Sequence, residues 1–280
     1  MEQAAGCARD VIKRFEGTAQ PALDGVSIDV APGQITGLVG PDGSGKTTLI
    51  RLLAGLMEPT SGEIAILGKP PAEMLDQLGY MPQRFGLYED LTVRENLNLY
   101  AELRALPPEE HDETFARLLA FTDLARFQDR LAGNLSGGMK QKLGLACTLV
   151  RTPKLMLLDE PSVGVDPVSR RELWSIVHSL VDQGITVLWA TAYLDEAERC
   201  DAVLLLNEGR LLVSGKPESF AKRLKGRTFA VRAASGDRRA VLREVLGLPH
   251  VVDAIIKGRD VRVLVSAEAD PSYLAHCCSA

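Results

Sequence analysis

The chain contains Gly40-Pro41-Asp42-Gly43-Ser44-Gly45-Lys46-Thr47, a full match to the pattern G-x-x-x-x-G-K-[ST]. A strand-like apolar run over residues 34–39 precedes it, and a helix-like run with Leu49, Leu52 and Leu53 follows it. Glycines let the backbone curl so that successive N–H groups point at phosphate oxygens. Strand, loop and helix in this order predict a phosphate-binding loop rather than an ordinary glycine-rich turn.

Two side chains of this loop have chemistry that their neighbours lack. The Lys46 ammonium should reach the β- and γ-phosphates of a nucleotide, and the Thr47 hydroxyl should bind Mg²⁺. We therefore expect the whole segment to bind the phosphates, through Gly40, Pro41, Asp42, Gly43, Ser44, Gly45, Lys46, Thr47 and Thr48.

A second candidate segment is the apolar run over residues 154–158, which ends in Asp159-Glu160-Pro161. A short continuous apolar run is typical of a strand buried on both faces of a parallel sheet, and ligands bind at the carboxyl ends of such strands. We expect Asp159 to belong to the metal shell, usually through water, and Glu160 to orient or deprotonate the attacking water. The alternative, a solvated acidic turn, is disfavoured by the phosphate loop.

A third motif lies between these two, Leu135-Ser136-Gly137-Gly138-Met139-Lys140-Gln141. It is typical of a helix start, because Ser136 can cap the helix, the two glycines let the backbone approach a ligand, and the first N–H groups favour an anion. In one chain, this helix and the phosphate loop need not face the same phosphate.

The three motifs in this order resemble the ATP-binding cassette of ABC transporters. The resemblance implies an α/β P-loop NTPase fold, with a mainly parallel core sheet and a helical subdomain, and it implies ATP and Mg²⁺ as ligands. In that family the signature run, here Ser136, Gly137 and Gly138, completes an ATP site on the opposing cassette. The expected activity is therefore that of an ATPase that works as a pair.

Further residues match the family pattern and receive roles from it. Gln83, in Tyr80-Met81-Pro82-Gln83, corresponds to the glutamine that senses Mg²⁺ and the γ-phosphate and joins the ATPase core to the helical subdomain. Phe15 stands where the family stacks an aromatic ring on adenine, with a core phenylalanine as the alternative. Asp166 matches the acid that touches the partner cassette.

One position departs from the family pattern. Ala192 stands where members of the family usually have a histidine that donates to the γ-phosphate and holds the catalytic glutamate. His111 and His178 are poor replacements by sequence and are interpreted as structural or surface residues. Because this donor is missing, hydrolysis at the chain's own site is expected to be slow.

Composition agrees with a globular protein, since 46% of the 280 residues are hydrophobic and 25% are charged. There is no run of 18 or more apolar residues and no signal-peptide pattern at the N-terminus. The five cysteines have no framework spacing, which indicates reduced thiols. With the resemblance, this predicts a peripheral protein on the cytoplasmic face of the inner (plasma) membrane.

The pattern of runs predicts a nucleotide-binding domain over residues 1–215, with a helical subdomain at about 84–149, and a small βαββ appendage over 216–280. Similar tails follow the cassette in ATPase subunits of type-2 ABC exporters. The resemblance implies that the helical subdomain docks on integral-membrane permease subunits. Phe85, Leu87 and Tyr88 are candidates for the floor of that groove, and ordinary core residues are the alternative.

Residues 216–244 carry nine basic and three acidic side chains, a net charge of +6, while the whole chain is at −5. Such a segment can contact nucleic acid or anionic lipid. Few aromatic residues interleave with the charges, so a solvated face is favoured and no nucleic-acid partner is expected.

Within the family, the runs over residues 85–93, 136–148 and 170–174 look most like the first cassette of tandem ATPase subunits in bacterial drug exporters. The predicted function is ATP binding and hydrolysis that power an exporter through ATP-dependent dimerisation with a second cassette. One alternative is a regulatory cassette with little hydrolysis, favoured by Ala192 and opposed by Glu160. The other is a soluble ABC protein acting on the ribosome or DNA, and the short gap from Gln83 to Ser136 excludes the long coiled coil of the DNA-repair type.

Overall fold

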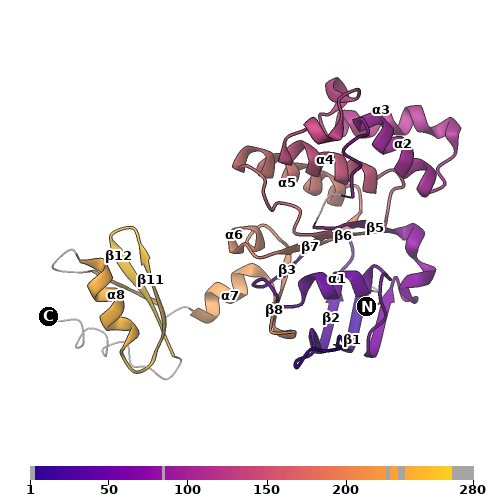
Figure 1. Ribbon diagram of the computed structural model, residues 1–280. Coiled ribbons are helices and arrows are strands. Elements are labelled where there is room, and N and C mark those ends of the chain that lie inside the picture. The colour runs from indigo at the N-terminus through magenta and orange to yellow at the C-terminus, as the bar shows by residue number, and fades with distance from the viewer. Residues whose placement is uncertain (1–3, 84–85, 225–227, 233–236, 267–280) are drawn as a thin grey trace. The chain divides into compact units, whose positions relative to one another are not determined.

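The computed structural model describes residues 4–83, 86–224, 228–232 and 237–266. The chain divides into two compact units, Met1–Pro217 and Glu218–Ala280 (Figure 1). The division lies two residues from the boundary that the sequence pattern predicts.

The first unit is built around a six-stranded sheet with the order β5-β6-β7-β3-β8-β9. All neighbouring strands in it are parallel except β8 and β9, so the predicted mainly parallel sheet is confirmed. Three of its strands, β3, β6 and β7, are buried along their whole length, as their continuous apolar runs require. The strands are β3 (Ile35–Val39), β5 (Leu78–Met81), β6 (Leu155–Asp159), β7 (Thr186–Thr191), β8 (Ala202–Asn207) and β9 (Arg210–Gly215).

Helices cover both faces of this sheet (Figure 1). One face carries α1 (Lys46–Leu53). The other carries α5, which packs on β7, and the helical region above it. The helices on that side are α2 (Val93–Leu103), α3 (His111–Phe121), α4 (Gly137–Thr148) and α5 (Pro167–Asp182), and the short α6 (Leu194–Ala197) follows β7.

A second, antiparallel sheet of the first unit has the order β2-β1-β4, with β1 (Gly6–Lys13), β2 (Leu23–Val30) and β4 (Ser61–Ile66). The alternation of strand-like and helix-like runs over residues 1–83 predicts that these strands join the mainly parallel sheet, but they form a separate antiparallel sheet. Residues 14–22, which connect β1 to β2, form a loop without a helix, whereas neighbouring parallel strands need a longer crossover, usually helical.

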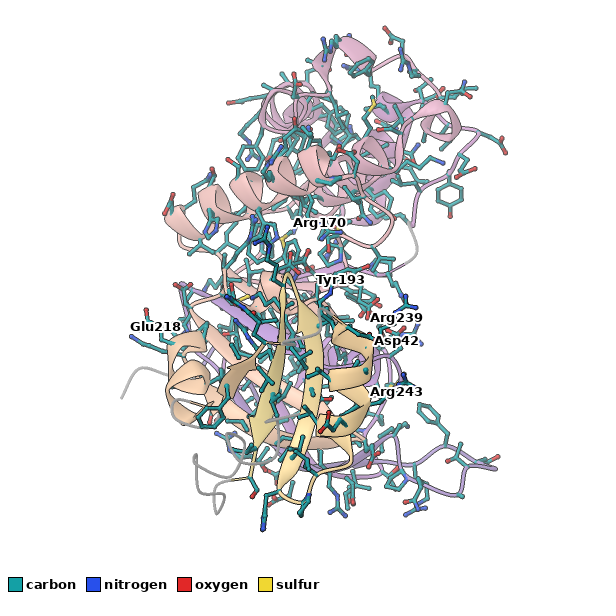
Figure 2. All side chains as sticks on the ribbon, turned by 90° about the vertical axis from the view of Figure 1, so that its left-hand side faces the viewer. Asp42, Arg170, Tyr193, Glu218, Arg239 and Arg243 are labelled. Atoms are coloured by element: carbon teal, nitrogen blue, oxygen red, sulfur yellow. The ribbon has the colours of Figure 1, made fainter. Side chains whose placement is uncertain are left out.

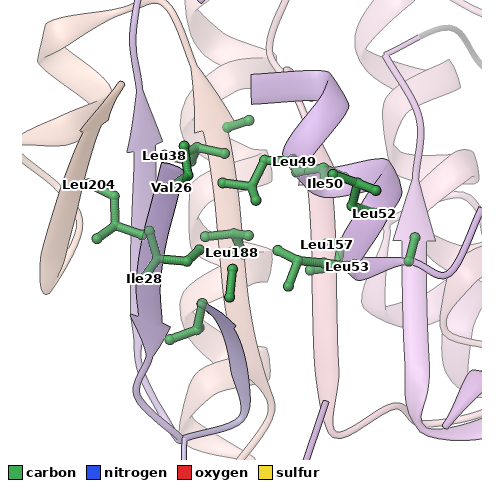
Figure 3. Packing of buried hydrophobic residues seen from close by; sticks show 14 of the residues in the cluster. Val26, Ile28, Leu38, Leu49, Ile50, Leu52, Leu53, Leu157, Leu188 and Leu204 are labelled. Atoms are coloured by element: carbon green, nitrogen blue, oxygen red, sulfur yellow. The ribbon is translucent and has the colours of Figure 1, made fainter. Parts of the chain in front are cut away.

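One hydrophobic core cluster of the first unit lies between its two sheets. Figure 3 shows the apolar side of α1, with Leu49, Ile50, Leu52 and Leu53, beside residues of both sheets. Leu157 and Leu188 come from the central sheet, and Val26 and Ile28 come from β2. Burial of such side chains is the main stabilising term, and it fixes the helix that begins at Lys46.

Two further features lie on the side of the central sheet that carries α5 (Figure 1). Trp174 of α5 stacks on Trp189 of β7 with ring centroids 4.2 Å apart, and these are the only two tryptophans of the chain. Helix α2 begins with a reciprocal cap, in which Thr92 and Glu95 each bond the other's backbone N–H. The region over residues 86–149 is mostly helical.

The second unit has the order β10-α8-β11-β12, with an antiparallel sheet β10-β12-β11. Its core contains Val245 of α8 together with Ala254, Val261, Val263 and Val265 of the sheet. The elements are β10 (Thr228–Val231), α8 (Arg238–Leu246), β11 (Val251–Lys257) and β12 (Asp260–Val265), and α7 (Pro217–Leu224) spans the boundary between the units.

The described part of the chain has no helix with the length and apolar character needed to cross a membrane. Cys7, Cys147 and Cys200 are free thiols, while Cys277 and Cys278 lie outside the described residues. Burial raises the pKa of Cys200 to about 12, so this thiol is not a reactive thiolate.

Candidate active site

A pocket of about 250 Å³ opens at the carboxyl ends of β3 and β6. It brings together the phosphate loop, Gln83 from the segment after β5, and Glu160, the residue after β6. This is where a parallel sheet with helices on both faces binds its ligands. The lining residues are Ala22, Asp42, Gly43, Gly45, Lys46, Thr47, Thr48, Gln83 and Glu160.

Neighbouring backbone fixes the start and the end of the phosphate loop. A Cβ at Gly40 would lie 2.1 Å from the carbonyl oxygen of Leu206, at the end of β8. Gly45 has a φ of +104°, and a Cβ there would lie 2.7 Å from the carbonyl oxygen of Ala22. Only glycine fits at these two positions, so the curl of the loop requires glycine at both.

The Lys46 side chain lies inside this curl. Its ammonium donates to the carbonyl oxygens of Gly40 at 2.8 Å and Pro41 at 3.1 Å. It also lies 3.1 Å from Glu160 Oε1, and the side chains of both residues are buried. The loop therefore presents one positive charge at the point where its N–H groups converge.

Thr47 and Asp159 form the next layer of the site. Thr47 Oγ1 donates to Asp159 Oδ1 at 3.0 Å, which leaves lone pairs of the Thr47 oxygen for another ligand. Asp159 Oδ2 is buried and has no hydrogen-bond partner among the described residues. Burial raises the pKa of Asp159, the Thr47 hydrogen bond opposes this, and the charge of Glu160 adds to the rise. The Asp159 carboxylate is thus short of positive charge, and the donor set fits Mg²⁺.

Glu160 is held in one orientation by its backbone and by two partners. Its φ is +53°, in the left-handed region that non-glycine residues rarely adopt and that is frequent at functional sites. Its backbone N–H donates to the Ala190 carbonyl oxygen at 3.1 Å. Gln83 Nε2 donates to Glu160 Oε2 at 2.9 Å, while Lys46 holds Oε1. The carboxylate is therefore fixed beside the phosphate loop.

Phe15, Ser136 and Asp166 are among the predicted site residues that do not line this pocket. Phe15 is 41% exposed, with Lys13 Nζ 5.3 Å from its ring centroid, so the core-phenylalanine alternative is wrong. Ser136 caps α4 and accepts from Met139 N at 3.3 Å. Asp166 caps α5, and hydrogen bonds from Ser169 and Val168 lower its pKa. Ser136 and Asp166 thus each start a helix elsewhere on the surface.

The two glycines of the signature run differ in their surroundings. A Cβ at Gly138 would lie 2.4 Å from both side-chain atoms of Ser169 on α5. A Cβ at Gly137 would meet the carbonyl oxygen of Gly164 at 3.1 Å. Gly138 is therefore needed for the packing of α4 on α5, a reason within the chain that the sequence did not reveal.

Residues 23–163 match a family model whose description is "ABC transporter". The chain belongs to the ABC transporter family. It is 54% identical over 268 residues to the "Probable multidrug ABC transporter ATP-binding protein YbhF" of Escherichia coli (strain K12), covering 94% of this chain and 46% of that protein. The chain thus spans about half the length of this relative.

Another relative is the "Linearmycin resistance ATP-binding protein LnrL" of Bacillus subtilis (strain 168), 32% identical over 251 residues that cover 88% of this chain and 80% of that one. Among solved structures, an "ATP binding subunit of ABC transporter" superposes with a TM-score of 0.70 at 32% identity. The match covers 79% of this chain and 93% of that chain. The predicted P-loop NTPase fold of ABC cassettes is thereby confirmed.

One polar centre of the cassette was not found from the sequence. Glu196 is fully buried and accepts from Trp189 Nε1 at 3.0 Å and from Thr191 Oγ1 at 2.6 Å. Ala192, which follows Thr191 in the chain, is exposed. An acid in a charged run such as Asp195-Glu196 is usually solvated, so the sequence carried no signal of this burial.

The proposed permease groove is only partly described. Phe85 lies outside the described residues. Leu87 is half-buried and Tyr88 is 56% exposed, so Tyr88 is not an ordinary core residue. Its backbone is fixed by Asn96, which is buried, accepts from Tyr88 N at 2.9 Å and donates to Tyr88 O at 3.0 Å.

Proposed function

We propose that this ABC cassette binds ATP with Mg²⁺ and hydrolyses it, and that hydrolysis powers a membrane exporter. The observation that carries the proposal is the convergence of Lys46, Thr47, Gln83 and Glu160 on one pocket, with Asp159 bonded to Thr47. The names of the relatives, which refer to multidrug transport and linearmycin resistance, support export as the process.

Each of these groups has a part in binding the nucleotide. The N–H groups of the loop and the Lys46 ammonium bind phosphate oxygens. Thr47 and Asp159 would hold Mg²⁺, directly or through water, and Gln83, which lines the same pocket, would sense it. The ion, when bound, neutralises charge on the phosphate oxygens.

Glu160 is the proposed catalytic residue. Phosphate oxygens compete with Glu160 for the Lys46 ammonium, because one cation lies within reach of both. Once Lys46 faces the phosphates, Glu160 can orient an attacking water or accept its proton, and its bond to Gln83 keeps the carboxylate in place.

We further propose that the cassette works opposite a second cassette, supplied by the same or a companion chain. Ser136 and Asp166 lie outside the pocket at the starts of α4 and α5, which supports a role in completing the partner's site. Integral-membrane permease subunits are the other proposed partners, which gives a peripheral location on the cytoplasmic face of the inner membrane. No nucleic-acid partner is proposed.

A second candidate function, a regulatory cassette with little hydrolysis, is favoured by Ala192. The position is exposed and its methyl group cannot donate to a γ-phosphate. Loss of one transition-state donor typically costs roughly 2.7–4 kcal/mol, about a hundred- to a thousand-fold in rate. This chain lacks one γ-phosphate donor at Ala192 but keeps its signature run. This difference favours a slow ATP site on this chain and a faster site on the partner, completed by Ser136.

The test is the ATPase activity of the assembled exporter. Glu160→Gln should lower total activity modestly, whereas Ser136→Arg should nearly abolish it, and Ala192→His should speed hydrolysis at this chain's site. The purified chain alone should turn over slowly. Collapse of activity with Glu160→Gln, or indifference to Ser136→Arg, would contradict the assignment of roles.

A further inference from the structure

Buried Glu196 organises the backbone around Ala192. Its Oε2 accepts from Trp189 and Thr191 of β7. Thr191 Oγ1 in turn accepts from the backbone N–H of Tyr193 at 3.0 Å. This chain of hydrogen bonds joins the residues on both sides of Ala192, so the carboxylate of Glu196 determines the path of the backbone there.

The segment held by Glu196 contacts the candidate active site through its backbone. The carbonyl oxygen of Thr191 accepts from Gly40 N at 3.2 Å, and that of Ala190 accepts from Glu160 N at 3.1 Å. Because residue 192 is alanine, the segment offers no side chain to a phosphate at that position. Its contribution to the site rests on the placement of Gly40 and Glu160.

Arg170 is the cation that faces Glu196. Its Nε lies 3.7 Å from Glu196 Oε1, and both atoms are buried without a hydrogen-bond partner in the described part of the chain. No other described basic residue is paired with Glu196. A buried carboxylate that loses its only cation is strongly destabilised, so Glu196 depends on Arg170.

Arg170 also contacts the rest of the segment. Its guanidinium carbon lies 4.9 Å from the ring centroid of Tyr193, and Nη1 lies 3.9 Å from Asp195 Oδ2 (Arg170 and Tyr193 are labelled in Figure 2). The residue itself lies in the first turn of α5, where its N–H donates to the carbonyl oxygen of the capping Asp166 at 2.9 Å. One side chain thus connects the start of α5 with the whole turn after β7.

We propose that Arg170 is a positioning residue of the ATP site. Through Glu196 and Thr191 it holds the backbone from Ala190 to Tyr193, and this backbone holds Gly40 and Glu160. The inference rests on the proposed function for its effect on catalysis, but its structural part does not depend on hydrolysis. A displaced Glu160 slows the chemical step more than it weakens binding, since Lys46 and the loop still hold the phosphates.

The first test compares Arg170→Met with Arg171→Met, an exposed arginine next to it on the same helix. In the assembled exporter carrying Ala192→His, so that this chain's site turns over measurably, Arg170→Met should lower kcat at that site roughly ten- to a hundredfold with KM for ATP within about twofold. Arg170→Lys should restore part of the loss because it returns the charge. Equal kcat in the two methionine variants would overturn the proposal, as would parallel loss of nucleotide affinity without rescue by lysine.

A second variant distinguishes loss of the Arg170–Glu196 contact from misfolding of Arg170→Met. Glu196→Gln removes the buried charge while its amide oxygen can still accept from Trp189 and Thr191. In this background Arg170→Met should change kcat by less than about twofold, since the two changes act through one contact. Additive losses would show that Arg170 acts by another route and would overturn the proposal.

Amide hydrogen exchange of the full chain separates this inference from the proposed function. The Tyr193 amide should exchange about tenfold faster in Arg170→Met than in Arg171→Met, with exchange in β3 unchanged. If exporter activity proves insensitive to Glu160→Gln and Ala192→His alike, hydrolysis at this site fails as a proposal, and exchange at Tyr193 still decides whether Arg170 positions the segment. Equal exchange in the two variants would overturn it.

Discussion

The Lys46 ammonium lies 3.1 Å from Glu160 Oε1, and the exposed fractions of the two side chains are 3% and 7%. One buried cation therefore lies within reach of both the phosphate-binding loop and the proposed catalytic base. Any change at Lys46 removes a phosphate ligand and also leaves a buried carboxylate with Gln83 as its remaining partner.

We predict that Lys46→Ala lowers the affinity for Mg-ATP by at least about tenfold, because Lys46 is the side-chain positive charge aimed at the phosphates. Equilibrium binding of ATP to the purified chain measures this. Lys154→Ala, at an exposed lysine before β6, is the matched control and should leave affinity unchanged. Equal affinity for wild type and Lys46→Ala would contradict the site assignment.

Asp159 should make stability depend on pH. Its pKa is raised in the folded chain, chiefly by burial, and the unfolded chain keeps the ordinary value. Protonation of Asp159 in the folded chain therefore adds to the free energy of unfolding. This contribution is fully present at pH values below the pKa of the unfolded chain and is lost as the pH rises through the pKa of the folded chain.

Asn cannot ionise, so without Mg²⁺ the free energy of unfolding of Asp159→Asn should exceed that of wild type most at neutral pH. The difference should shrink as the solution becomes acidic. Urea unfolding in the presence of a chelator, at neutral and at acidic pH, measures the difference in the free energy of unfolding. A difference that stays constant between acid and neutral pH would contradict the prediction.

Gly138→Ala should destabilise the first unit by about 1–3 kcal/mol, because the new methyl overlaps Ser169. Gly144→Ala on the same helix is the control, since it meets only the flexible end of Met81 at 3.3 Å and should be nearly neutral. Ser169→Gly removes the overlapping atoms and should recover part of the loss in the double variant. Thermal or urea unfolding of wild type, Gly138→Ala, Gly144→Ala and the double variant measures these differences in the free energy of unfolding. If Ser169→Gly recovers none of the loss, the overlap is not its cause.

Phe15→Ala should weaken ATP binding and leave binding of inorganic tripolyphosphate unchanged. The exposed ring is free on the surface to stack on a base, and stacking on an aromatic side chain contributes about 1–3 kcal/mol per base. Competition of both ligands against a fluorescent nucleotide measures the two affinities. A parallel loss for both ligands would show that Phe15 supports the loop rather than the base.

The sequence predicted the parts of the site that depend on local pattern. The phosphate loop lies between β3 and α1, Asp159 ends β6, and Glu160 follows it. Because the carboxyl ends of parallel strands meet at one edge of a sheet, these acids come to lie beside Lys46 and Thr47. Motif and topology together were sufficient for this part.

Other features depend on contacts between distant segments, which local pattern does not encode. The antiparallel sheet β2-β1-β4 follows from a loop that lacks a crossover helix. The need for Gly138 arises from Ser169 on a different helix. The burial of Glu196 requires Arg170, Trp189 and Thr191 to close around it. Composition and periodicity are the same whether or not such contacts form.

The stacked pair Trp174 and Trp189 gives the chain an intrinsic optical reporter. Trp174 belongs to α5 and Trp189 to β7, and the Trp189 N–H donates to Glu196. Because the chain has no other tryptophan, emission excited at a wavelength that tyrosine does not absorb comes from this one pair. Any nucleotide or partner that shifts α5 against β7 can therefore be followed in real time in the unlabelled protein.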